Sequence, residues 1–423
     1  MNDMYNTDND NMDVDQIGDG KPPYGFGDEN QNKKKNHSFA KGVALGAVGA
    51  VVIVGAATFG LKAVVGSSSD VVSSDTLKKL SKIQKLIDNN FLHDEDEDSV
   101  QDGILKGYVD GLGDVYSVYY NEEETAALEE STSGEYCGVG AVLSEDASTG
   151  VVTITEVYDD SPAQKAGLVA DDILYKVDDT EVTGMDLTKV VSYVKGDQGT
   201  EVKLTVLRGD DNEQLELTAT RDKIEAHTVS YKMLDDQIGY IKVTEFDSVT
   251  TDQYKEAMDD LENQGMERLI VDLRNNPGGN VSTVCEMLDM MLPEGLIVYT
   301  EDKDGNKQEV TSDEENQFTK PLVVLMNGNS ASASEIYAGA IQDYGIGKIV
   351  GTQSYGKGVV QQIFDLGDGT SLKLTIADYY TPNGRNINGE GITPDEEVEY
   401  VADENNKDAD NQLDKAIEVV KSE

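Results

Sequence analysis

The stretch ERLIVDLRNNPGGNVSTVCEMLDMML, residues 267–292, contains the pattern that decides the fold. Its run LIVDL is short and apolar, which is typical of a buried strand. The glycines of RNNPGG mark a turn, and apolar residues then recur at helical spacing. A second strand and helix follow in PLVVLMN and ASEIYAGAIQDYG, and GKIVGT is a further strand. This alternation over residues 224–400 predicts an α/β core with parallel strands.

Three segments described here precede this core, and a fourth follows it. Residues 76–134 contain two apolar patterns at helical spacing, so they predict a helical N-terminal region. From residue 135 the apolar period changes to two, and residues 135–223 predict a compact α+β module of strands and two short helices. Residues 63–75 are a polar linker. The last segment, residues 401–423, is an acidic C-terminal tail with one helical pattern.

The N-terminal part predicts a membrane anchor. Residues 1–41 lack apolar periodicity and favour a disordered, acidic cytoplasmic tail. Residues 42–62 begin with an uncharged run of about 20 residues, long enough to span a bilayer as one transmembrane helix. The lysines before this run place the N-terminus in the cytoplasm and the later domains outside. A cleaved signal peptide is the alternative, but its n-region would be about forty residues long.

Composition excludes several classes of function. The chain has 34 Lys and Arg against 82 Asp and Glu, a net charge of −48. No nucleic-acid partner is expected, because a phosphate backbone requires a basic surface. The two cysteines, Cys137 and Cys285, are too few for a disulfide scaffold and too far apart for a CxxC metal site. We expect no metal and no cofactor.

Two loops of the core carry candidate chemistry. The run GTQSYGKG resembles a phosphate-binding loop, but Gly358 stands where such a loop needs a hydroxyl. Lys357 in that run needs another explanation than nucleotide binding. Ser330, Ser332 and Ser334 alternate at a predicted strand–helix junction. One helix cap accounts for a single serine, and a serine there can also direct its hydroxyl into a cleft.

A nucleophilic serine requires a base. His93 and His227 carry no catalytic signal, and His37 lies in the predicted cytoplasmic tail. A lysine can serve instead when burial lowers its pKa towards neutrality, and the glycines beside Lys357 permit close packing. The amides of the RNNPGG turn could also meet a substrate carbonyl, although an ordinary strand–helix turn explains them equally well.

Eight motifs, in order, resemble the carboxy-terminal processing, or tail-specific, serine proteases. They extend over residues 76–400, and together they are specific although each alone is weak. The motifs are GLGDVYSVYY, SGEYCGVGAVL, SPAQKAGLVADDIL, IGYIKVTEF, LIVDLRNNPGG, NSASASEIYAGAIQDYG, GTQSYGKGVVQ and YYTPNGRNINGEGITPD. The resemblance implies a protease core of mixed α/β fold, like the crotonase and Clp-type cores, and a PDZ domain at residues 135–223.

The resemblance also assigns catalytic roles. Ser332 corresponds to the nucleophile, Lys357 to the general base, and Gln361 to the residue that orients this lysine. The N–H groups of Ala333 and Gly278 would form the oxyanion hole.

The resemblance also concerns two positions outside the catalytic set. Asp343 matches an acidic position tied to activity in some members, and a structural role at the helix end is the alternative. Lys195 stands where members often have an arginine linked to gating, so this sequence departs from the family pattern there.

The PDZ resemblance implies how a substrate would bind. Cys137, Gly138, Val139 and Gly140 match the carboxylate-binding loop, and the helix at residues 187–194 would line an apolar side-chain pocket. A peptide with an apolar C-terminal tail would add there as a strand.

The sequence thus predicts a membrane-anchored serine endopeptidase with extracytoplasmic PDZ and protease domains. It would bind polypeptide C-terminal tails and cleave nearby peptide bonds through an acyl-enzyme. Relatives form dimers, so a homodimer is compatible with the resemblance. The alternatives are a catalytically silent PDZ binding or sensor protein and a crotonase-like acyl-CoA enzyme. The presence of Ser332, Lys357 and Gln361 together argues against the first, and the anchor and PDZ module argue against the second.

Overall fold

The computed structural model describes residues 70–209, 211–313, 315–402, 406 and 409–423. The predicted cytoplasmic tail, the predicted transmembrane helix and the first part of the linker lie outside these residues. Within them, every helix is too short or too polar to cross a membrane.

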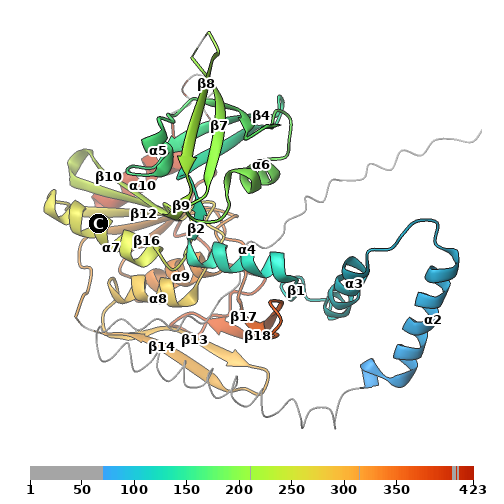
Figure 1. Cartoon of the computed structure of the whole chain (residues 1–423). Helices are drawn as coiled ribbons and strands as arrows, with labels where there is room; N and C mark the ends of the chain where they lie inside the picture. Colours follow the sequence, from blue (N-terminus) through green and yellow to red (C-terminus); the bar gives the residue numbers. More distant parts are fainter. Residues whose placement is uncertain (1–69, 210, 314, 403–405, 407–408) are drawn as a thin grey trace, which may run out of the picture.

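The α/β core is built on a six-stranded sheet, labelled in part in Figure 1. Its strands occur in the order β10 (Val229–Leu234), β11 (Ile238–Val243), β12 (Arg268–Asp272), β15 (Leu322–Met326), β16 (Lys348–Gly351) and β19 (Glu396–Glu397). All neighbours from β11 to β19 are parallel, and only the edge strand β10 is antiparallel. The parallel strands predicted from the apolar runs are therefore confirmed.

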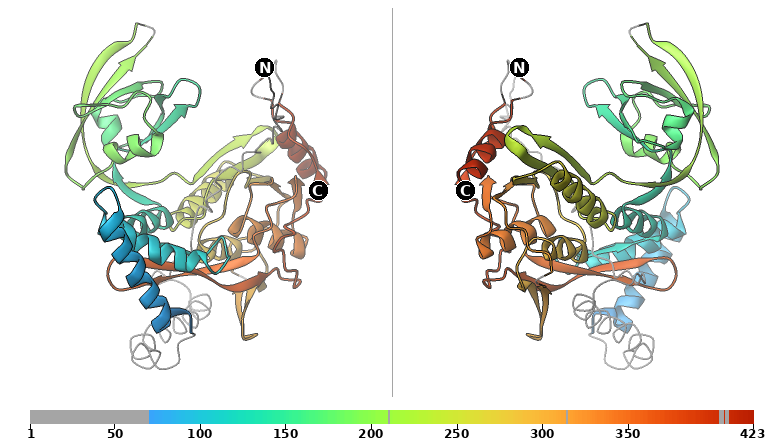
Figure 2. Two further views of the ribbon diagram at one scale, coloured as in Figure 1. Left: turned by 90° about the vertical axis from the view of Figure 1, so that its right-hand side faces the viewer. Right: turned by 90° about the vertical axis from the view of Figure 1, so that its left-hand side faces the viewer.

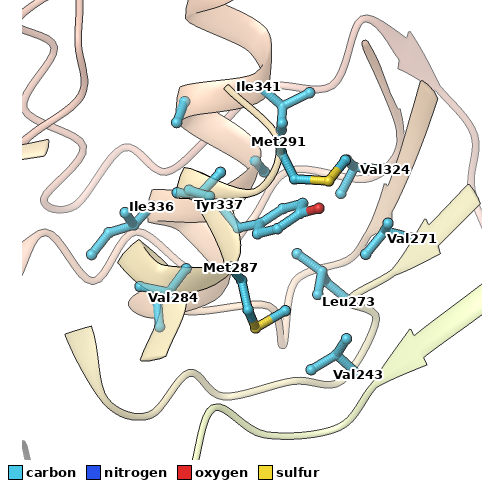
Figure 3. Packing of buried hydrophobic residues seen from close by; sticks show 14 of the residues in the cluster. Val243, Val271, Leu273, Val284, Met287, Met291, Val324, Ile336, Tyr337 and Ile341 are labelled. Carbon is cyan, nitrogen blue, oxygen red and sulfur yellow. The ribbon is translucent and has the colours of Figure 1, made fainter. Parts of the chain in front are cut away.

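Helices cover both faces of this sheet, as buried parallel sheets require. One face packs against α7 (Thr250–Asn263), α8 (Val281–Asp289) and α9 (Ala333–Tyr344). In Figure 3 the ring of Tyr337, from α9, lies among Met287, Met291 and Leu273. The other face packs against α10 (Asn411–Ser422), which buries Ala416 and Val420. The helical pattern predicted within the tail at residues 401–423 is therefore present as α10, and its apolar stripe packs on the core.

A second sheet lies beside the first. It contains β1 (Val118–Tyr120), β13 (Gly295–Asp302), β14 (Lys307–Ser312), β17 (Val359–Asp365) and β18 (Ser371–Tyr380). The three-residue strand β1 interrupts the region predicted to be helical. It is a strand because it pairs antiparallel with β18, a long-range contact that leaves no local pattern. The rest of that region is helical, in α2 (Ser74–Asn90), α3 (Glu97–Asp110) and α4 (Glu122–Ser133).

The predicted α+β module follows α4 and stands apart from the core in Figure 2. A two-stranded stem, β2 (Glu135–Gly138) with β9 (Asp222–Glu225), connects its two ends to the core. Its six-stranded sheet comprises β3 (Ala141–Asp146), β4 (Val151–Val157), β5 (Ile173–Val177), β6 (Thr180–Glu181), β7 (Glu201–Arg208) and β8 (Glu213–Thr220). Two short helices, α5 (Pro162–Ala166) and α6 (Leu187–Val194), complete it. The module has its own apolar cluster, which includes Ile154, Val190 and Val202.

Candidate active site

The parallel sheet positions the site. The carboxyl ends of parallel strands meet at one edge, and loops from neighbouring strands there lie together. The loop after β12 carries Gly278, the loop after β15 carries Ser332, and the loop after β16 carries Lys357. Because β12, β15 and β16 are consecutive in the sheet, residues far apart in sequence gather at this edge.

Of the three alternating serines, two have structural roles. Ser330 Oγ donates to Leu273 O at 2.8 Å, and Ser334 Oγ donates to Asn276 O at 2.9 Å. Both hydroxyls therefore hold the loop after β12 against the start of α9. Ser332 Oγ is buried and finds no hydrogen-bond partner among the described residues. The structure thus leaves only the middle serine of this run with an unengaged hydroxyl.

Ser332 also has a strained backbone. Its φ of 56° and ψ of −113° place a residue with a side chain in a region that favours glycine. Such strain persists only where the surroundings hold it, and it is common at functional sites. Here Tyr379 contributes, since its hydroxyl lies 3.2 Å from Ser332 O and 2.7 Å from Lys357 O.

Glu335 connects the two loops, a role that was not predicted from the sequence. Its Oε2 accepts from the N–H groups of Ser332 at 2.8 Å and Lys357 at 2.9 Å. Its Oε1 accepts from Ser354 Oγ at 2.5 Å and Gly356 N–H at 2.7 Å. All four partners are donors, so the buried side chain is satisfied as a carboxylate. The spacing S-x-x-E at a predicted helix start was the signal that could have found it.

Lys357 is buried, with 5% of its surface exposed. Its pKa is lowered to about 8, chiefly by burial and then by the nearby Lys373 charge, while Glu335 and Asp114 act in the opposite direction. Its ammonium lies 5.0 Å from the centre of the Tyr116 ring. A lysine whose pKa is near 8 exists partly as a neutral amine at neutral pH, as a general base must.

Gln361 lies on β17 and is also buried. Its Nε2 makes long contacts of 3.4 Å with Val359 O and Thr375 Oγ1. Its Oε1 accepts no hydrogen bond from the described residues, so that oxygen does not hold the Lys357 ammonium in this structure.

Gly278 packs directly against the serine. A Cβ atom on Gly278 would lie 2.8 Å from both Ala331 O and Ser332 Cβ, and its φ is +109°. Only glycine fits this approach without strain. The Gly278 N–H, however, donates to Asn276 Oδ1 at 2.8 Å. The predicted oxyanion residues are thus adjacent, but one of the two donors is engaged elsewhere.

Asp343 has a structural environment. It lies in the last turn of α9, about 16 Å along the helix from Ser332. Its Oδ1 pairs with Arg385 Nη2 at 2.5 Å, and its Oδ2 accepts from Asn383 N–H at 2.8 Å. The structure therefore separates Asp343 from the serine and lysine.

Neither of the two histidines within the described residues is placed to act as the base. His227 stacks on Tyr158, with Nδ1 3.5 Å from Glu156, and His93 packs edge-on against Phe91. Across the part of the chain that the structure describes, no three His, Cys, Asp or Glu side chains are grouped to hold a metal ion.

The predicted carboxylate-binding loop runs from β2 into β3. Its carbonyls are engaged inside the module, with Cys137 O accepting from Gly196, Val139 O from Ala163 and Gly140 O from Tyr158. A Cβ on Gly140 would lie 2.5 Å from the Ser161 Cβ, so this turn requires glycine. The loop thus has a fixed conformation at the end of the module beside the stem.

Comparisons with known proteins agree with this architecture. Residues 237–398 match the model of peptidase family S41, residues 153–208 match a PDZ domain, and residues 54–125 match the N-terminal domain of the activating protease CtpB. The carboxy-terminal processing protease CtpA of Bacillus subtilis is 34% identical over 341 residues, which cover 80% of this chain and 72% of that protein. This chain belongs to the carboxy-terminal processing proteases of peptidase family S41.

Two further proteins are similar to this protease. A probable CtpA-like serine protease of Staphylococcus saprophyticus is 33% identical over 340 residues, covering 80% of this chain and 68% of that protein. The solved photosystem II D1 C-terminal processing protease is 30% identical, with a TM-score of 0.44, and the match covers 73% of this chain and 84% of that one.

The Glu335 carboxylate offers a first test on the protease. In Glu335→Gln an amide NH₂ replaces one oxygen and faces two hydrogen-bond donors. We expect the free energy of unfolding to fall by about 3 kcal/mol and cleavage of an unstructured protein to fall with it. Thermal unfolding and a cleavage assay measure both. The control is Glu418→Gln, whose side chain is 73% exposed. Equal stability of the two variants would contradict the central role of Glu335.

Proposed function

We propose that this protease cleaves peptide bonds with Ser332 as nucleophile and Lys357 as general base. The observation that carries the proposal is the shared support of the two residues. One carboxylate binds both of their N–H groups and one tyrosine hydroxyl contacts both of their carbonyls. The serine hydroxyl is unengaged, and the lysine is buried with a pKa near 8.

The reaction would proceed through an acyl-enzyme. Ser332 Oγ attacks the substrate carbonyl carbon while its proton passes to the neutral amine of Lys357. The C–N bond then breaks, and the Lys357 ammonium returns the proton to the leaving amine. Water, deprotonated by the same amine, attacks the ester and releases the second product, which restores the Ser332 hydroxyl.

The oxyanion would accept hydrogen bonds from the N–H groups of Ala333 and Gly278. For Gly278 to donate, its peptide must leave Asn276, and a glycine at positive φ can make that rotation at low cost. The substrate carbonyl oxygen would then replace Asn276 Oδ1 as the acceptor.

Cleavage should depend on both residues and on pH. In the full chain we expect Ser332→Ala and Lys357→Ala each to reduce cleavage by about 10³-fold or more while the fold persists. Because the neutral amine is the active form, kcat/KM should rise about tenfold per pH unit below 8 and level off above it.

The measurement is cleavage of an unstructured protein between pH 6 and 10, with thermal unfolding of each variant as the control. Full activity of either variant would exclude the dyad. A silent binding protein would instead show no serine-dependent cleavage at any pH.

The PDZ domain would select the substrate through its C-terminus. We propose that the loop at residues 137–140 binds the terminal carboxylate and that α6 lines the pocket for an apolar terminal side chain. The Ser332→Ala chain permits a binding measurement without turnover.

Fluorescence anisotropy with this variant should show that an apolar-tailed peptide binds at least tenfold more tightly than its C-terminally amidated form. A peptide ending in aspartate serves as the control for the side-chain pocket. Equal affinity of the free acid and the amide would exclude carboxylate recognition.

We also propose that residues 42–62 anchor the protease, with the PDZ and protease domains outside the cell membrane. The full chain should remain with membranes after extraction at pH 11, and a variant lacking residues 42–62 should be released. A mature N-terminus located after residue 62 would contradict the anchor and support a cleaved signal peptide.

A further inference from the structure

A second buried lysine lies near the site. Lys373, on β18, is 1% exposed and is one of the largest side chains that the fold buries completely. It forms no ion pair within the residues that the structure describes. Its ammonium instead lies 5.2 Å from the centre of the Tyr120 ring. Burying a cation without a carboxylate is costly, so this position requires an explanation.

The strand register places Lys373 on the face that carries Gln361. Gln361 is directly opposite Thr375, and Ile363 is directly opposite Lys373. Residues opposite each other in an antiparallel pair share a face, as do residues two positions apart on one strand. Lys373 is therefore a diagonal neighbour of Gln361, whose Nε2 contacts Thr375 on the same face.

The two lysines also lie against the same short segment of the chain, residues 116–120. Lys357 lies over Tyr116 and Lys373 lies over Tyr120, both in the short segment that leads into and forms β1. Ring faces stabilise a cation but do not neutralise it, so the two ammonium groups repel each other.

The other titratable groups around Lys357 and Lys373 do not share the effect that Lys373 has on the pKa of Lys357. Those that influence Lys357 are Asp114 and Glu335, whose negative charges oppose the effect of Lys373. Tyr116 and Tyr379 line the site with pKa values raised by burial, so both stay neutral. For Lys373, burial lowers the pKa to about 8.

We propose that Lys373 is a positioning residue for catalysis, a second cation whose charge favours the neutral, proton-accepting form of Lys357. The inference rests on the proposed function of Lys357. Two coupled amines titrate as a pair, and each makes loss of the first proton from the pair easier. A cationic neighbour is an established way to activate an amine in a desolvated pocket. Burial and the second charge together offset the attraction of Glu335 and Asp114.

Replacement of Lys373 separates this role from packing. Lys373→Met keeps the length and apolar contacts of the side chain and removes its charge. Lys373→Arg keeps the charge at every accessible pH. Lys232→Met is the matched control, because Lys232 also lies over a tyrosine, Tyr240, but on the edge strand β10 of the other sheet.

Two measurements on the full chain test the proposal. Competitive labelling with acetic anhydride across pH, read by mass spectrometry of the peptide that contains Lys357, reports the midpoint of its amine. Cleavage of an unstructured protein gives the pH profile of kcat/KM.

In Lys373→Met we expect both midpoints to rise by about one pH unit, so that kcat/KM at pH 7 falls about tenfold and recovers at high pH. Lys373→Arg should keep both midpoints at or below the wild-type values, and Lys232→Met should keep the wild-type midpoints. The melting temperature of Lys373→Met should equal or exceed that of the wild type.

Two results would overturn the proposal. One is an unchanged Lys357 midpoint in Lys373→Met, and the other is a loss of activity that is equal at every pH, as a purely structural role would produce. Failure of the proposed function would give a different result. The labelling midpoint of Lys357 would still rise in Lys373→Met, but the Ser332→Ala variant would still cleave the unstructured protein.

Discussion

The buried carboxylate of Glu335 is the interaction on which the site depends. Four donors converge on it, from the start of α9 and from the loop after β16. Without it, three backbone N–H groups would be buried unpaired, and each such group costs about 1–3 kcal/mol. The same bonds hold Ser332 in its strained conformation and fix the backbone of Lys357. One side chain therefore links the stability of this edge of the sheet to the geometry of both proposed catalytic residues.

Much of the architecture was predictable because its signals are local. Apolar runs followed by glycine turns revealed the parallel strands, and the ordered motifs identified the family. Strand β1 was assigned incorrectly because its structure comes from a distant partner, β18, and the packing of the predicted helix α10 against the sheet likewise depends on residues far away in the chain. Three residues of β1 carry no periodicity of their own, and the apolar stripe within residues 401–423 predicted a helix but not the sheet face against which it packs.

Within the site, residue type and motif position singled out Ser332 and Lys357, but their surroundings required the fold. Three serines alternate in sequence, and only the tertiary hydrogen bonds of Ser330 and Ser334 show which hydroxyl remains unengaged. In the sequence, nothing distinguishes Lys373 from an ordinary lysine of an amphipathic strand. Its burial depends on β1 and β17, which pack on either side of β18. The orientation of the Gly278 N–H likewise depends on Asn276, which no pattern distinguishes from its neighbours.

The pairing of β1 with β18 also has a consequence for biosynthesis. Ser117 and Thr375, which hydrogen-bond beside this pairing, are 258 positions apart in the chain. Contacts of such long range form late, because a large loop must close before they are made. Domains begin to fold from the N-terminus during synthesis, so the PDZ domain can fold before the end of the protease core has emerged. The segment at residues 116–120, beside Lys357, is therefore held in place only after β18 has been synthesised, later than the PDZ domain.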